Sequence, residues 1–188
     1  MPSALIVSTS EKGQAVLREM LSASRFDRIA TASNGNDARR ALISQAFELV
    51  VINTPLTDEF GHELAAYASS VGAGVIMLCK EEHAEQLSAT LEREGVFVMS
   101  KPLVRPLFMQ ALRLVEMTQA RMYELIMERD KLRKQLDDLR AVSRAKCLLI
   151  EKMGWSEDAA HRHIEKQAMN LRVSKREVAE GILRTYSV

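Results

Sequence analysis

The feature that most constrains the fold is an apolar seam in the second half of the chain. Over residues 111–139, seam positions recur at alternating steps of four and three residues, and only Thr118 and Arg129 among them are polar. No Gly or Pro occurs between Pro106 and Gly154, so no residue in this stretch is expected to end a helix. A seam that repeats every 3.5 residues over about four heptads is typical of a coiled coil.

We therefore predict one continuous helix over residues 103–153, in which residues 103–140 pair two copies as a parallel homodimer. The polar seam residues lower the stability of such a pair but can fix its register. The alternative is an amphipathic helix lying on its own domain, although so long and narrow a seam exceeds the length of a small globular neighbour. The residues predicted to pair are Val115, Met122, Leu125, Leu132, Leu136 and Leu139.

The composition is that of a globular protein with room for one ordinary domain and a smaller one. The chain has 188 residues, of which 47% are hydrophobic and 27% charged. We expect no membrane span and no secretory signal, because no apolar run approaches about 18 residues and the start lacks a basic region followed by a hydrophobic core. Cys79 and Cys147 are far apart, which favours reduced thiols, a cytoplasmic protein and no metal site.

The charge is distributed unevenly along the chain. Residues 1–100 contain 8 Lys and Arg against 13 Asp and Glu, whereas residues 101–188 contain 18 against 12. Phosphate backbones attract clustered cations. Any nucleic acid is therefore expected to bind to the C-terminal part.

The first hundred residues alternate between strand-like and helix-like segments. Short apolar runs predict five strands, and amphipathic stretches between them predict helices, the last over residues 82–94. This alternation predicts an α/β fold, a doubly wound parallel five-stranded sheet with helices on both faces, followed by an all-α region. The predicted strands are residues 4–8, 29–32, 49–52, 75–78 and 96–99.

Residues 1–102 resemble the receiver domain of two-component response regulators. The resemblance rests on LIVS in the first strand, SNGNDARRAL after the second, LVVINTPLTDEFG around the third, VIMLC at the fourth and FVMSKP at the end. In that family, two acidic residues after the first strand hold Mg²⁺, and an aspartate ending the third strand takes the phosphoryl group. A Thr or Ser ending the fourth strand and a Lys after the fifth complete the site.

This sequence departs from the receiver pattern at nearly every site residue. Ser8 and Thr9 replace the acidic pair, Asn53 replaces the phosphoryl-accepting aspartate, Cys79 replaces the Thr or Ser, and only Lys101 matches. A carboxamide cannot form an acyl phosphate, and hydroxyls hold a hard divalent cation poorly. We predict a pseudo-receiver that is not phosphorylated, binds no metal and is controlled by a regulatory protein partner.

The last part, residues 141–188, predicts a small helical module. Gly154 is expected to end the long helix, Ser156 to cap a second helix, and Ser174 with Glu177 to form a capping box that opens a third. Side chains expected in the core of this module include Met153, Ala159, Ala160, Ile164, Ala168 and Met169.

This module resembles the ANTAR domain, an RNA-binding module of transcription antitermination regulators. The resemblance rests on AKCLLI from residue 145, MGWSEDAA from residue 153, Ala168-Met169 and Val178-Ala179. It departs at Cys147, where Gly is common, and at His161, where an aromatic residue is common. The resemblance implies that a dimer binds tandem stem-loops with six-nucleotide loops in nascent mRNA leaders and prevents a terminator from forming. We expect no enzymatic activity and no cofactor.

Cations around the second helix and on the long helix are the candidate RNA contacts. Unpaired loop bases carry the sequence information in such an RNA, and cations contact the stem phosphates. Trp155 has two interpretations, since it can staple the turn between helices or stack on a base. The candidate contacts are Arg144, Lys146, Arg162, His163, Lys166, Lys175 and Arg176.

Two other functions compete with RNA binding. Three short helices can imitate a helix-turn-helix that binds DNA, although no helix here is rich in the Arg, Asn and Gln of a recognition helix. The chain could also be an interaction protein that has lost nucleic-acid binding. A catalytic function has least support, because the sequence contains no nucleophile–base pair, metal-ligand cluster or phosphate-binding glycine loop.

Overall fold

The computed structural model describes residues 2–186, which divide into two compact units. The first unit ends at Met122 and the second begins at Tyr123, within one long helix. The elements of the first unit are β1 (Ser3–Ser8), α1 (Glu11–Ser22), β2 (Arg28–Ala32), α2 (Gly35–Ser44), β3 (Leu49–Asn53), α3 (His62–Ser70), β4 (Gly74–Cys79), α4 (Glu81–Leu91), the 3-10 turn η1 (Glu92–Glu94) and β5 (Val96–Ser100). The long helix α5 (Arg105–Met153) follows, and then α6 (Glu157–Leu171) and α7 (Lys175–Tyr186).

The five strands form one parallel sheet in the order β2-β1-β3-β4-β5. Each neighbouring pair is parallel, with Ile6 opposite both Thr31 and Val51. The inner strands are apolar at consecutive positions because both faces of the sheet are covered. The predicted doubly wound parallel sheet is therefore confirmed.

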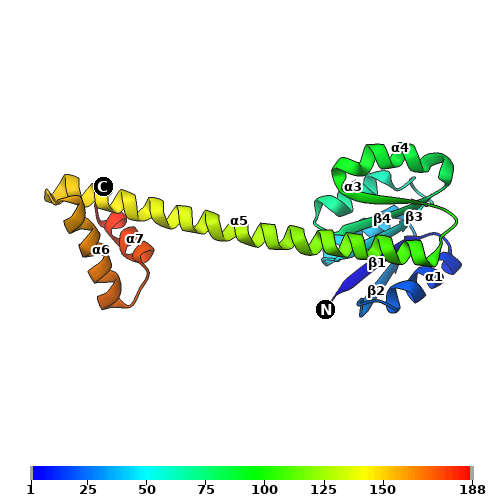
Figure 1. The fold of residues 1–188 in the computed structure, drawn as a ribbon, viewed down its shortest axis with the longest axis horizontal. Coiled ribbons are helices and arrows are strands. Elements are labelled where there is room, and N and C mark those ends of the chain that lie inside the picture. The colour runs from blue at the N-terminus through cyan, green and yellow to red at the C-terminus, as the bar shows by residue number, and fades with distance from the viewer. Residues whose placement is uncertain (1, 187–188) are drawn as a thin grey trace. The chain divides into compact units, whose positions relative to one another are not determined.

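Each face of the sheet has its own core. One core packs alternate strand residues such as Val50 and Met77 against α2, α3 and α4. The other packs the intervening residues, such as Val51 and Ile76, against α1 and the first turns of α5. In Figure 1, α3 and α4 lie on one side of the sheet and α1 on the other.

The start of α5 belongs to the first unit. Phe108, Ala111 and Leu112 are buried, and Val115 packs against the same core. At Gly74 a Cβ atom would lie 2.5 Å from the Val115 side chain, so only glycine admits this contact. The prediction that Val115 pairs with a second copy is therefore wrong, because its side chain lies against the sheet of its own chain.

The long helix is continuous, as predicted, over the 49 residues Arg105–Met153. The predicted helix over residues 82–94 is shorter, because α4 ends at Leu91 and the chain tightens into η1. Among the described helices, none combines the length and the apolar character needed to cross a membrane.

The second unit closes around a small core between α5, α6 and α7. Both predicted helix starts are confirmed: the Ala159 amide donates to the Ser156 hydroxyl at 3.2 Å, and the Ser174 amide donates to the Glu177 carboxylate at 2.8 Å. These bonds satisfy amides that would otherwise lack partners at the two helix ends. The core is made by Ala145, Leu149, Ala160, Ile164 and Ala179.

Three predicted core residues of this unit are wrong. Met169 is 79% exposed, Met153 is 47% exposed, and Ala159 is exposed. In α6 the buried stripe is Ala160, Ile164 and Ala168, at steps of four. Each of the positions 159 and 169 is one residue away from that stripe, about 100° around the helix, and so faces outward.

Candidate functional site

The carboxyl ends of the parallel strands bring together the residues at the positions that match the receiver site. Ser8 ends β1, Asn53 ends β3, and the Asn53 Nδ2 donates to the Ser8 Oγ at 2.9 Å. A Cβ atom at Gly13 of α1 would lie 2.9 Å from both side chains, so α1 packs directly over this pair. The hydroxyl and the carboxamide thus satisfy each other in a position where the receiver family has carboxylates.

Lys101 and Cys79 lie at the same edge of the sheet. The Lys101 ammonium donates to the Thr54 carbonyl, and burial lowers the pKa of Lys101. The buried Cys79 thiol is close to the Met99 carbonyl, with an Sγ–O distance of 3.8 Å, and burial raises the pKa of this thiol. Thr9 is exposed. The matching Lys is therefore used to hold the backbone, and the thiol stays neutral.

A hollow of about 360 Å³ opens over these residues, with Asn53 and Lys101 among its lining. No lining residue of this hollow carries a carboxylate. Nowhere in the described residues do three or more His, Cys, Asp or Glu side chains gather as a metal site. The lining of this hollow therefore provides neither a carboxylate that could form an acyl phosphate nor the anionic oxygen ligands that Mg²⁺ prefers.

The two acidic residues that follow β3 are occupied elsewhere. The Asp58 carboxylate accepts from the Gly35 and Asn36 amides at 2.8 and 2.9 Å, and these bonds lower the pKa of Asp58. Glu59 pairs with the Arg39 guanidinium at 2.6 Å. Asp58 therefore holds the start of α2, and Glu59 holds the middle of the same helix.

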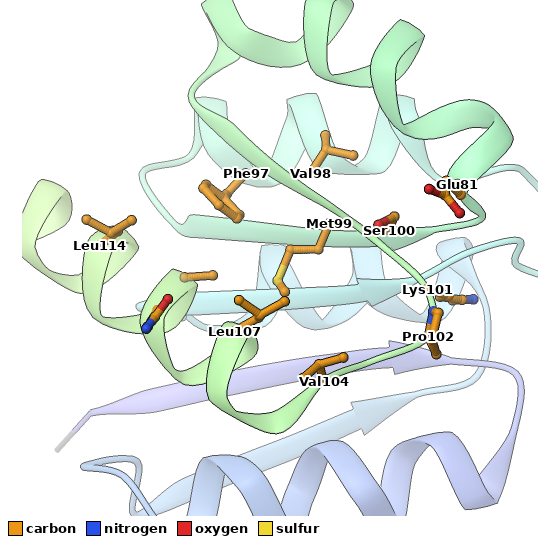
Figure 2. Close-up of a pocket in the computed structure, with 12 residues that line it drawn as sticks. Glu81, Phe97, Val98, Met99, Ser100, Lys101, Pro102, Val104, Leu107 and Leu114 are labelled. Carbon is orange, nitrogen blue, oxygen red and sulfur yellow. The ribbon is translucent and has the colours of Figure 1, made fainter.

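A second hollow, of about 510 Å³, lies between β5 and α5. Figure 2 shows Phe97 and Met99 of β5 beside Leu107 and Leu114 of α5. Phe97 is 37% exposed, and Leu107 and Leu114 are 54% and 55% exposed. We call this surface the β5–α5 hollow. The sequence analysis missed it, because it lies outside the predicted pairing residues.

The remaining predicted pairing residues are open to solvent, and two of them lie on the same face of α5 as the leucines of the β5–α5 hollow. Leu107 and Leu114 of the hollow and the pairing residues Leu125 and Leu132 follow one another at steps of 7, 11 and 7 residues. Each step is close to a whole number of helical turns, so the four side chains share one face of α5. The pairing residues Met122, Leu125, Leu132, Leu136 and Leu139 are 50%, 45%, 53%, 54% and 67% exposed.

Some of the seven candidate RNA contacts are paired with carboxylates in the structure, and others are not. The Lys146 ammonium lies 2.8 Å from the Glu157 carboxylate and lowers the pKa of Glu157. The Arg176 guanidinium lies 2.7 Å from Glu180 and 2.9 Å from Asp138, and these bonds raise the pKa of Arg176.

Of the other candidate cations, one has a carboxylate partner and three do not. Lys175 pairs with Glu165. Within residues 2–186, Arg144, Arg162 and Lys166 have no carboxylate partner, and the Arg162 Nε donates only to the Asp158 backbone carbonyl at 3.3 Å.

His163 belongs to a different environment from the free cations. Its ring meets the Trp155 ring edge-on, with centroids 4.9 Å apart and planes at 63°. Trp155 also packs against the core of the second unit, as a staple would, but its side chain is only partly buried and remains accessible to a ligand. Both rings line a hollow of about 650 Å³ that also includes Tyr186, Gln167 and Leu171. We call this surface the aromatic groove.

Comparisons with known proteins agree with this geometry. Residues 130–183 match the model of the ANTAR domain family. The aliphatic amidase regulator of Pseudomonas aeruginosa is 26% identical over 140 residues, which are 71% of this chain and 69% of that protein.

Solved structures match through the receiver fold. The receiver domain of an HD domain-containing protein from Pseudomonas fluorescens has a TM-score of 0.57 at 24% identity, covering 65% of this chain and 92% of that one. A two-component AraC-type regulator from Clostridium phytofermentans has a TM-score of 0.58 at 20% identity, covering 64% and 97%. The chain therefore joins a receiver fold to a segment that matches the ANTAR family.

Proposed function

We propose that this chain is a dimeric RNA-binding regulator of transcription. In this proposal, the dimer binds tandem stem-loops with six-nucleotide loops in a nascent mRNA leader and prevents a terminator from forming. The observation that carries the proposal is a helical module matching the ANTAR family with unpaired cations on its surface. The relative from Pseudomonas aeruginosa, whose name states that it is a regulator, supports a regulatory function.

The phosphate-contacting surface is assigned to the unpaired cations. Arg162 and Lys166 are four residues apart on α6 and therefore point from the same face of that helix. Neither has to leave a carboxylate before it can neutralise a phosphate. Lys146, Lys175 and Arg176 are held by acids, so we assign these three to holding the module together. Arg144 is exposed on α5 and completes the free set.

Salt dependence in a binding titration tests the proposed function. The chain is titrated at several salt concentrations onto labelled RNA with a single hairpin, so that one module of the dimer binds. An RNA binder loses affinity steeply as salt rises, because each phosphate contact releases counterions. Replacing Arg162 and Lys166 with Ala is expected to weaken binding about 10- to 100-fold and to flatten the salt slope by about 1.5 to 2.

A matched control separates local contacts from net charge. Replacing Lys12 and Arg93, which are exposed cations of the first unit, with Ala removes the same charge. This control is expected to leave both affinity and slope nearly unchanged. Equal losses in the two variants would contradict the assignment of Arg162 and Lys166, and salt-independent or absent binding would contradict RNA binding itself.

The seam on α5 is proposed to hold two copies together in parallel. Its leucines are half exposed in one chain, and burying them against a second copy removes apolar surface from water. Leu107 and Leu114 share the face of Leu125 and Leu132, so we propose that the same partner copy covers the β5–α5 hollow. A dimer suits a tandem target, since the first module to bind raises the effective concentration of the second.

The first unit is proposed to act as a pseudo-receiver under the control of a protein partner. Asn53 bonded to Ser8 offers no acyl-phosphate chemistry, and the hollow above this pair lacks carboxylates. Control must then come through binding instead of phosphorylation. The acidic surplus of residues 1–100 favours a partner with a basic surface.

Incubation with acetyl phosphate and Mg²⁺ is expected to leave the mass of the protein unchanged. The physical reason is the absence of both the accepting carboxylate and the metal-holding acids. The measurement is intact-protein mass spectrometry, with a functional receiver protein as the positive control. A stable gain of about 80 Da, the mass of one phosphoryl group, on residues 1–102 would overturn the pseudo-receiver assignment.

A further inference from the structure

The aromatic groove does not include the three cations that we assign to phosphate contacts, so it is a separate surface of the second unit. It is formed where the end of α5, the turn at Trp155, α6 and α7 meet, and its volume of about 650 Å³ lies within the range of about 300–1,000 Å³ typical of ligand pockets. Leu171 and Val173, two of its lining residues, are 63% and 38% exposed. A small module that leaves this much apolar surface uncovered has a surface suited to a flat, apolar ligand.

The rings of the groove are arranged to receive another ring. Trp155 and His163 meet edge-on at 4.9 Å, which leaves ring faces that are not stacked on each other. The Tyr186 hydroxyl donates to the Met153 Sδ at 4.0 Å, so a weak contact holds this third ring of the groove. Aromatic side chains of this kind stack on unpaired bases, with little dependence on which base is bound.

Polar groups in the groove can recognise the edge of a base. Gln167 lies among the lining residues, and within residues 2–186 its carboxamide makes no hydrogen bond. A carboxamide offers both a donor and an acceptor, which matches the mixed edges of nucleobases. The one carboxylate in the lining, that of Glu177, is engaged with the Ser174 amide and hydroxyl. The groove therefore presents the neutral carboxamide of Gln167 as its free bidentate group, while the Glu177 carboxylate is already held by Ser174.

The unpaired cations lie on the same helix as the groove residues. His163, Gln167 and Leu171 follow one another at steps of four on α6, and Arg162 and Lys166 each precede one of them by a single residue. The cationic stripe is thus about 100° around the helix from the groove stripe. A nucleotide with its base in the groove has its phosphate within the reach of long cationic side chains on this neighbouring stripe.

We propose that the aromatic groove binds one unpaired base of the RNA loop. The base stacks among Trp155, His163 and Tyr186, the Gln167 carboxamide hydrogen-bonds its edge, and Arg162 and Lys166 contact the flanking phosphates. This inference rests on the proposed RNA function and names the site that recognises the loop. It assigns sequence recognition to the groove and general affinity to the cations.

The fluorescence of Trp155 reports directly on this site, because it is the only Trp in the chain. The full-length protein is titrated with a hairpin RNA, and binding is followed in parallel by the anisotropy of a label on the RNA. A base stacked in the groove is expected to quench Trp155 in proportion to the bound fraction. A series of RNAs with one abasic position at a time in the loop then identifies the base, since one position is expected to abolish the quenching.

A substitution in the groove supplies the second readout. Gln167→Ala is expected to weaken binding to the native RNA about 10-fold. With the RNA that lacks the critical base, the Gln167→Ala variant and the unchanged protein are expected to bind equally, because the two changes remove the same contact. Ala is a good helix former, so α6 remains intact. Met169→Ala, on the outward face of α6, is the matched control and is expected to bind as the unchanged protein does.

The outcomes separate this inference from the proposed function. RNA that binds by anisotropy without quenching Trp155, together with a neutral Gln167→Ala, overturns the groove and leaves RNA binding intact. Trp155 fluorescence that changes with protein concentration in the absence of RNA shows that a second copy covers the groove, which also overturns the inference. Absence of any RNA binding by anisotropy overturns both.

Discussion

Replacing Leu125, Leu132 and Leu139 together with Asp is expected to give a monomer in analytical ultracentrifugation. The three side chains are 45%, 53% and 67% exposed in a single chain, so the change costs that chain little packing. In a paired helix the same positions face a second copy, and six carboxylates would be placed in an apolar seam. Burying unpaired charge is costly enough to separate the chains.

The control for this variant uses the opposite side of the same helix. Ala120, Tyr123 and Met127 are exposed and lie about half a turn away from Leu125, so replacing them with Asp adds the same charge to α5. This control is expected to stay dimeric. A dimer that survives the leucine replacement would contradict the seam and would place the pairing surface at the β5–α5 hollow.

The monomer is also expected to lose the advantage of a tandem target. A second module held at a fixed separation raises the overall affinity by about 10²- to 10⁴-fold without any new contact. The leucine variant should therefore bind a two-hairpin RNA no more tightly than a single hairpin, while the control keeps its preference for two. Anisotropy titrations with one- and two-hairpin RNAs measure this difference.

The long helix was predictable from the sequence, but the surfaces that it covers were not. The lack of Gly and Pro between residues 106 and 154 is a local property, and local properties set helix continuity. Apolar periodicity marks a face without naming its partner. Val115 fits the seam by spacing, yet its side chain packs on the sheet beside Gly74, a contact 41 positions away in the sequence.

The receiver centre was the most predictable part of the candidate site. Ser8 and Asn53 end two predicted parallel strands, and parallel neighbours bring their ends to one edge of the sheet, so their proximity follows from the topology. The use of Asp58 and Glu59 to hold α2 was not predictable, because it depends on how α2 and the loop after β3 pack together.

The candidate RNA surface was predictable only as a list of cations. Charge and helical spacing give the face of Arg162 and Lys166, but tertiary contacts decide which cations are free. Arg176 pairs with Asp138, which is 38 residues away, and sequence spacing holds no signal for that pair. The aromatic groove was missed for the same reason, since its lining comes from three helices and a turn. The one available signal was the single Trp155 in a basic module.

The central claim is that the chain recognises unpaired loops in RNA. The most direct measurement is a gel shift of the full-length protein with a leader RNA that carries two hexanucleotide loops. The same RNA with scrambled loops and a duplex DNA of equal length are the controls. Scrambling leaves the phosphates in place and changes only the order of the loop bases, so it isolates base recognition from electrostatic attraction.

The account predicts a shifted complex with the native loops and at least about 100-fold weaker binding to the scrambled loops, since each bidentate contact to a base edge discriminates against the wrong base by about 1–3 kcal/mol. Duplex DNA is expected to bind only weakly and with strong salt dependence. Equal binding to the native and scrambled loops, or tighter binding to the duplex DNA, would contradict loop recognition and with it the proposed function.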